Sequence, residues 1–174
     1  MEQEYTIIAF SENAIGLLSR VTIIFTRRHI NIESLTVSQS SIKGVHKFTI
    51  VVNVTQEKVE KVTKQIDKLV EVLKAFYHTP EEIIQQEIAL YKVPTDAFIK
   101  SKEIESLVRS QGIRILEITP EYTVIEKTGL KSETQALFQI LDKYGVTQFT
   151  RSGVVAITRN PKELLTEYLK EIGQ

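Results

Sequence analysis

Cysteine is absent from this chain of 174 residues. Disulfide bonds, thiol catalysis, iron–sulfur clusters and cysteine-ligated zinc are therefore excluded. Only three histidines occur, and no two of them have the spacing of a metal-ligating or catalytic pair. The sequence also lacks a Walker-type phosphate loop and the GxGxxG pattern of dinucleotide-binding proteins. No sequence feature supports a catalytic activity of the chain itself.

The chain also has no excess charge of either sign, since Lys plus Arg and Asp plus Glu both number 22. This neutrality removes the electrostatic reason to expect nucleic acid or an anionic membrane as a partner. No apolar run approaches the ~20 residues that cross a bilayer. The first residues, MEQEYTIIAF, lack the basic segment of a signal peptide. The expected location is the cytoplasm.

What the sequence does contain is an alternation of strand-like and helix-like segments. The first 78 residues predict the order β-α-β-β-α-β of the ferredoxin-like motif. The predicted strands are residues 5–10, 30–40, 45–54 and 72–78, and the predicted helices are residues 14–28 and 56–70. Apolar side chains recur at helical spacing in the helices and alternate along the strand that opens the hairpin.

A linker at residues 79–85, with a proline and a charge cluster, separates a first domain (residues 1–78) from a second (residues 86–174). The second domain repeats the six-element order, with strands at 87–93, 113–118, 122–128 and 147–159 and helices at 96–109 and 132–144. Asp96 is the expected N-cap of the first of these helices. The last strand is expected to bend or break at Ser152 and Gly153. The fold class is therefore α+β, with two ferredoxin-like βαββαβ domains.

Residues 160–174 predict a short amphipathic helix, with Asn160 as its N-cap and Pro161 at the first helical position. Its apolar stripe consists of Leu165, Tyr168, Leu169 and Ile172. We expect this stripe to pack against the C-terminal domain to which the helix is assigned. A helix that binds a partner protein is the alternative.

The segment SENAIGLLSRV (residues 11–21) places Gly16 at the start of a predicted helix. Glycine there costs a helix about 0.5–1 kcal/mol relative to alanine, so another requirement must favour it. The first amide groups of a helix lack internal partners and bind carboxylates, and Asn13 offers its side-chain amide beside them. One interpretation is a site for a free amino acid, whose aliphatic side chain contacts Ile15 and Leu17.

The other interpretation is structural: Asn13 or Ser11 caps the helix, and Gly16 permits close packing. On the residues alone we favour this structural interpretation. Asn31 has the same ambiguity, since an asparagine between two isoleucines either fixes a turn or presents its amide to a ligand. An RNA-binding role has little support, because the strand HKFTIVVNV has one phenylalanine and no glycine–aromatic pattern.

Four stretches make the sequence similar to one protein family. They are ENAIGLLSRVTIIFTRRHINIESLTV, EIALYKV, EITPEYTVIEKTG and RSGVVAITR, in this order up to Arg159. The chain thereby resembles the regulatory small subunit of acetolactate synthase (acetohydroxyacid synthase), whose N-terminal module is a ferredoxin-like ACT domain. It departs from the family at His29 and Ile30, where glycine and an aromatic residue are usual. It departs again at Ala14 and Ile15, where small or more polar residues are common.

The resemblance implies a regulatory subunit and not an enzyme. Family members form homodimers through their ACT domains and bind valine between the two copies. They activate a large catalytic subunit and make it sensitive to feedback inhibition in branched-chain amino acid biosynthesis. Isoleucine and leucine are alternative effectors. Thiamine diphosphate, magnesium and FAD are expected in the large subunit, and this chain is expected to hold no cofactor or metal.

The resemblance also implies which residues bind the effector. The matching positions are Asn13, Gly16 and Leu17 on one chain and Asn31 and Ile32 on the other, with Ile15 and Leu18 as additional lining residues. Two other classes of function stay open at this point. One is a stand-alone ACT-domain amino-acid sensor without an enzyme partner, and the other is a fragment of an ACT-containing enzyme.

Overall fold

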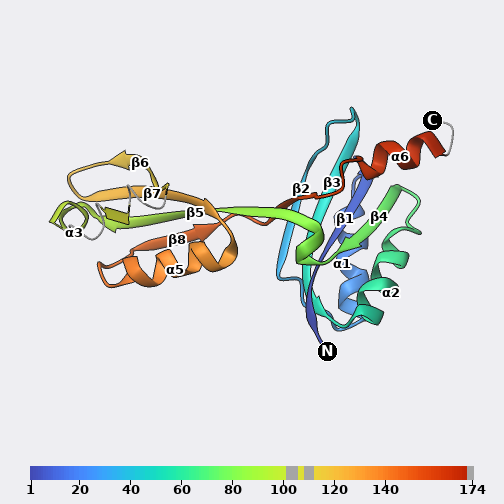
Figure 1. Cartoon of the computed structure of the whole chain (residues 1–174), viewed down its shortest axis with the longest axis horizontal. Coiled ribbons are helices and arrows are strands. Elements are labelled where there is room, and N and C mark those ends of the chain that lie inside the picture. The colour runs from blue at the N-terminus through green and yellow to red at the C-terminus, as the bar shows by residue number, and fades with distance from the viewer. Residues whose placement is uncertain (101–105, 108–111, 172–174) are drawn as a thin grey trace. The chain divides into compact units, whose positions relative to one another are not determined.

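The computed structural model describes residues 1–100, 106–107 and 112–171 (Figure 1). The chain divides into two compact units. The first unit combines Met1–Gln85 with Val154–Gln174, and the second is Gln86–Gly153. Each unit contains the ferredoxin-like order of strands and helices that the sequence predicts. Among the described residues, no helix has both the length and the apolar character needed to cross a bilayer.

The sheet of the first unit has the strand order β2-β3-β1-β4. The elements of this unit are β1 (Gln3–Glu12), α1 (Leu17–Arg27), β2 (Ser34–Gln39), β3 (Val45–Val54), α2 (Gln56–Ile66), β4 (Val72–His78), η1 (Pro80–Glu82), β9 (Val155–Thr158) and α6 (Leu164–Glu171). Strand β1 pairs with β3 along its whole length. The first six predicted elements are thus confirmed, although α1 begins after the predicted residue 14 and α2 ends before the predicted residue 70.

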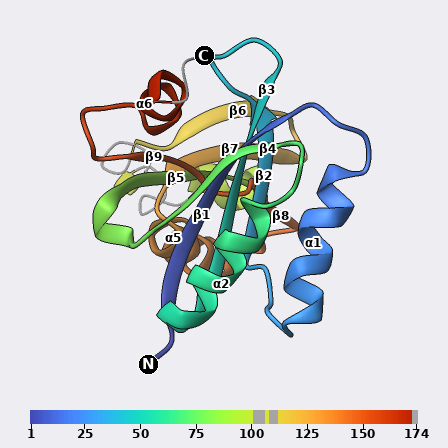
Figure 2. The ribbon, with the colours of Figure 1, turned by 90° about the vertical axis from the view of Figure 1, so that its right-hand side faces the viewer.

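Strand β1 is central in this sheet and is buried on both faces. Ile7 and Ala9 belong to the core that the sheet forms with α1 and α2. Ile8 and Phe10 alternate with them and therefore lie on the opposite face. Figure 2 shows α1 and α2 side by side on one face of the sheet. The unbroken apolar run TIIAF is typical of a strand whose two faces are both covered.

The end of the chain covers the second face. Strand β9 pairs with β5 (Ile83–Pro94), and the N–H of Arg159 donates to the carbonyl of Glu82 at 2.8 Å. Helix α6 then brings Leu165, which is fully buried, into the apolar cluster of Ile8 and Phe10. The segment after residue 153 therefore belongs to the core of the first unit.

This grouping differs from the predicted division, which assigns residues 86–174 to one C-terminal domain. Residues 154–174 group with residues 1–85 instead. The reason is that the α6 stripe is buried on the sheet of the first unit, with Tyr168 and Leu169 beside Leu165. Ile172, the last predicted member of the stripe, lies outside the described residues. The predicted linker at 79–85 is also structured, as η1 and the start of β5.

The predicted cap of this helix is wrong. Helix α6 begins at Leu164, so Asn160 precedes it. The side-chain oxygen of Asn160 accepts a hydrogen bond from the Lys162 N–H at 3.0 Å, which closes a turn. The carboxylate of Glu163 caps the helix by accepting from the Thr166 N–H at 2.6 Å.

The second unit has the strand order β6-β7-β5-β8. Besides β5, its elements are α3 (Thr95–Lys100), β6 (Arg114–Ile118), β7 (Tyr122–Gly129), α5 (Lys131–Asp142) and β8 (Gln148–Arg151). Helix α3 begins at Thr95, so Asp96 lies in its first turn and is not the predicted N-cap. Residues 101–105 and 108–111 of the predicted helix lie outside the described residues. The predicted break at Ser152 and Gly153 is confirmed, since it separates β8 from β9.

A buried polar cluster connects β5 to α5 in the second unit. Glu87 is only 3% exposed, and its carboxylate accepts from the hydroxyl of Thr134 at 2.5 Å and lies 3.5 Å from Nε of Arg151. The Tyr91 hydroxyl donates to the carbonyl of Thr134 at 2.6 Å, and burial raises the pKa of Tyr91 to about 12. The buried charge is tolerated because it is paired and hydrogen-bonded.

We expect Leu165→Ala to destabilise the first unit by about 2–5 kcal/mol, because it removes a fully buried side chain from the core. Hydrogen exchange of the β1 and β3 amides over a urea series measures this change. Val70→Ala is the matched control: Val70 is 95% exposed in the same unit, and its loss should change stability by less than about 0.5 kcal/mol. Equal protection in the two variants would show that α6 is not part of this core.

Candidate functional site

The loop between β1 and α1 is shaped by one glycine. Gly16 is the N-cap residue of α1, with φ 80° and ψ −1°. This left-handed conformation costs other residues about 1–2 kcal/mol. No side chain of the described residues caps the helix, so the prediction that Asn13 or Ser11 does so is wrong. The Leu17 N–H donates to the carbonyl of Ala14 at 3.3 Å, and the next two amides of the first turn, those of Leu18 and Ser19, have no side-chain cap.

The prediction that Gly16 permits close packing within the chain is also wrong. A Cβ atom built on Gly16 would meet no atom of the described residues within 4 Å. The positive φ is sufficient to explain the glycine. The space beside it is open to a group from outside the chain.

The side chains of the other predicted residues in this loop differ in their exposure to solvent. Asn13 is exposed, Ile15 is fully exposed at 104%, and Leu18 is 47% exposed. Leu17 is only 2% exposed and belongs to the core. The side chain of Leu17 therefore cannot line a ligand site at this loop.

Asn31 and Ile32 lie at the other end of α1. This helix has 11 residues and is therefore about 16 Å long. Asn31 is exposed, and its side-chain amide donates to the carboxylate of Glu33 at 2.9 Å. Ile32 is half-buried against the core of the first unit. A single chain thus does not bring the two predicted halves of the site together.

A second left-handed residue stands beside this half of the site. His29 has φ 52°, the only positive φ outside glycine in the described residues. This conformation explains why glycine suits the position before Ile30, which is buried at 8% exposure.

The described residues hold no group of three or more histidine or acidic side chains placed to bind a metal ion.

Comparison with known proteins matches both units. Residues 7–74 match the model of the ACT domain of acetohydroxyacid synthase small subunits, and residues 86–160 match the model of the small subunit of acetolactate synthase. The chain is 34% identical over 162 residues to the acetolactate synthase small subunit of Mycobacterium bovis, covering 93% of this chain and 96% of that protein. The chain belongs to the acetolactate synthase small subunit family.

Two other members of the family are similar to this chain over most of its length. The acetolactate synthase small subunit of Bacillus subtilis is 35% identical over 152 residues, which cover 87% of this chain and 88% of that one. The crystal structure of the acetolactate synthase small subunit from Thermotoga maritima superposes with a TM-score of 0.82 at 32% identity, covering 92% of this chain and 99% of that one. The resemblance read from the sequence is thereby confirmed.

The sequence did not predict that the fold of this chain brings together two polar side chains. Lys47 on β3 and His78 at the end of β4 line one cavity, beneath the segment that leads into α6. A lysine in a strand with two covered faces was the available signal. It could not be used, because the sequence did not reveal that residues 154–171 cover that face.

We expect Gly16→Ala to lower the free energy of unfolding by about 1 kcal/mol, because alanine must adopt the left-handed conformation. Gly16→Asn should lose less than half of that, since asparagine tolerates positive φ. Urea unfolding of the two variants compares them. Equal losses would mean that the backbone conformation of Gly16 is not what selects glycine.

Proposed function

We propose that this chain is the regulatory subunit of an acetolactate synthase in branched-chain amino acid biosynthesis. It activates a separate large catalytic subunit and makes that subunit sensitive to feedback inhibition by valine. Family membership supports the partner, since a small subunit implies a larger one that carries the catalysis. Thiamine diphosphate, magnesium and FAD belong to that large subunit in this proposal.

The observation that carries the valine site is the uncapped start of α1 at Gly16. The valine carboxylate accepts hydrogen bonds from the first amides of the helix, where the helix dipole also favours a negative charge. The valine ammonium group meets the amide oxygens of Asn13 and Asn31. Its isopropyl group lies against exposed apolar side chains of the loop, Ile15 and Leu18.

A second copy of the chain completes the site. A two-fold axis perpendicular to α1 sets the start of one helix beside the end of the other, so Gly16 of one copy meets Asn31 of its partner. Strand β2 lies at the edge of its sheet. Apolar side chains are exposed on α1 and β2 for such a homodimer, with Leu18 at 47%, Ile23 at 45% and Val37 at 41%.

Regulation follows from this shared site by linkage. Valine inhibits only if it binds the dimer arrangement of the less active state more tightly than that of the active state. Such coupling is typically ~1–3 kcal/mol. One methylene in an apolar pocket discriminates by only about 1–3 kcal/mol, so isoleucine and leucine are alternative effectors of the same site.

We expect Gly16→Asp to abolish valine inhibition and to leave activation of the large subunit intact, because the added negative charge repels the effector carboxylate. Gly16→Asn is the matched control, with the same shape and no charge, and should retain most of the inhibition. The assay is the reconstituted holoenzyme with and without valine. Unchanged inhibition in Gly16→Asp would refute the site. Failure to stimulate or co-purify with a large subunit would instead favour a stand-alone amino-acid sensor.

We expect Asn31→Ala to weaken valine binding more than it weakens the fold. The Asn31 side chain is exposed and donates a hydrogen bond to Glu33, two residues away, so its removal should change stability by less than about 0.5 kcal/mol. Calorimetric titration with valine and a thermal melt measure the two effects. A large drop in melting temperature with intact affinity would assign Asn31 a structural role.

A further inference from the structure

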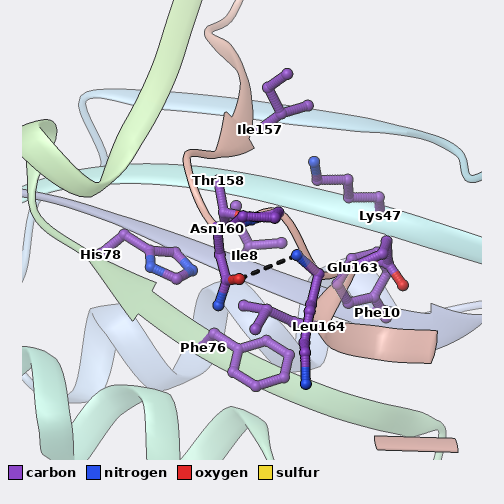
Figure 3. A pocket seen from close by; sticks show the side chains of 12 residues that line it. Ile8, Phe10, Lys47, Phe76, His78, Ile157, Thr158, Asn160, Glu163 and Leu164 are labelled. Atoms are coloured by element: carbon purple, nitrogen blue, oxygen red, sulfur yellow. Dashed lines mark hydrogen bonds between the residues drawn. The ribbon is translucent and has the colours of Figure 1, made fainter. Parts of the chain in front are cut away.

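A cavity of about 190 Å³ lies within the first unit, between the second face of its sheet and the segment that leads into α6 (Figure 3). Its walls are apolar on one side, where Ile8 and Phe10 of β1 and Phe76 of β4 are exposed to it. Lys47 and His78 add polar groups to the same space. The cavity has room for a small organic molecule.

Lys47 is the cation of this cavity. Its ammonium group donates to the carbonyl of Ala156 at 2.5 Å, which uses one of its three donors. Burial lowers the pKa of Lys47, and the nearby carboxylate of Glu163 opposes that shift. An anion in the cavity would accept from the remaining donors and would stabilise the partly desolvated charge.

His78 offers the cavity an acceptor. Its Nε2 is buried and has no hydrogen-bond partner among the described residues, while its Nδ1 lies 3.9 Å from the Glu82 carboxylate. Burial lowers the pKa of His78, the Lys47 ammonium lowers it further, and Glu82 opposes both. A neutral imidazole that carries its proton on Nδ1, the nitrogen nearer to Glu82, presents Nε2 to the cavity as an acceptor. Figure 3 shows the ring directed toward the other lining side chains.

The other charged groups of the lining are already engaged. The Glu163 carboxylate accepts from the Thr166 N–H at 2.6 Å, and the Lys162 ammonium lies 3.5 Å from the Glu167 carboxylate. With Lys162 and Glu163 engaged, the Lys47 ammonium is the charged group that a ligand in the cavity meets. This cation favours a ligand that carries a carboxylate.

We propose that this cavity is a second ligand site, which binds a short 2-hydroxy monocarboxylate. The carboxylate accepts from Lys47, the 2-hydroxyl donates to Nε2 of His78, and the short carbon chain lies against Ile8, Phe10 and Phe76. Acetolactate, which names the family, is one compound of this class. Gly16 does not line the cavity, so the proposal is independent of the valine site.

Calorimetric titration of the full chain with 2-hydroxy-3-methylbutanoate, acetolactate and two analogues tests the ligand class. The analogues are 3-methylbutanoate, which lacks the 2-hydroxyl group, and 2-oxo-3-methylbutanoate, which cannot donate from C2. We expect the hydroxy acids to bind at least about tenfold more tightly than either analogue. Equal affinity for all four compounds, or no binding of any, would overturn the proposal.

Two lysine variants test the position of the site. Lys47→Met keeps the apolar stem and removes the ammonium group, and should weaken hydroxy acid binding at least about tenfold. Lys74→Met is the matched control, because Lys74 lies on β4, pairs with Asp67 at 3.0 Å and does not line the cavity. Unchanged binding by Lys47→Met, or an equal loss in Lys74→Met, would place the ligand elsewhere.

A measurement on the unmodified chain keeps the proposal testable if Lys47→Met does not fold. The ring ¹⁵N resonances of the three histidines should be followed while 2-hydroxy-3-methylbutanoate is added. Nε2 of His78 should shift, and the rings of His29 and His46 should not. Gly16→Asp should keep this response, which separates failure of the valine site from failure of the cavity. No shift at His78 on saturation would refute its role as acceptor.

Discussion

Strand β1 has to be buried on both of its faces, and much of the first unit follows from that requirement. Ile7 and Ala9 face α1 and α2, while Ile8 and Phe10 face the opposite side. The two helices of a ferredoxin-like order lie on one face of their sheet (Figure 2), so the motif alone leaves Ile8 and Phe10 in water. The chain resolves this by returning after residue 153 and placing α6 over them.

The same layer creates the polar cavity. Where β9 and the approach to α6 cross the sheet, the apolar contact between them is incomplete, and Lys47 and His78 fill part of the space. The loop at Gly16 has a different origin, since it depends on a single backbone conformation. The two proposed sites of this unit therefore depend on separate structural features. The cavity depends on tertiary packing, and the loop depends on local backbone geometry.

Local patterns in the sequence predicted the order of elements well, because each strand and helix of a ferredoxin-like unit is marked by its own periodicity. Strand β4 matches its predicted range at both ends. The errors concern partners that are distant in sequence or set by backbone angles. The apolar stripe of α6 predicted that one face of this helix is buried. It did not indicate which of the two sheets the helix packs against. The positive φ of Gly16, and the absence of a cap by Asn13, depend on dihedral angles that no periodicity encodes.

The grouping of residues 154–171 with residues 1–85 has a consequence for synthesis on the ribosome. Domains generally fold in the order in which they emerge. Here the first sheet emerges early but keeps Ile8 and Phe10 uncovered until the chain has been translated through α6. A nascent chain stalled in that interval exposes an apolar surface, which makes it a natural client for chaperones.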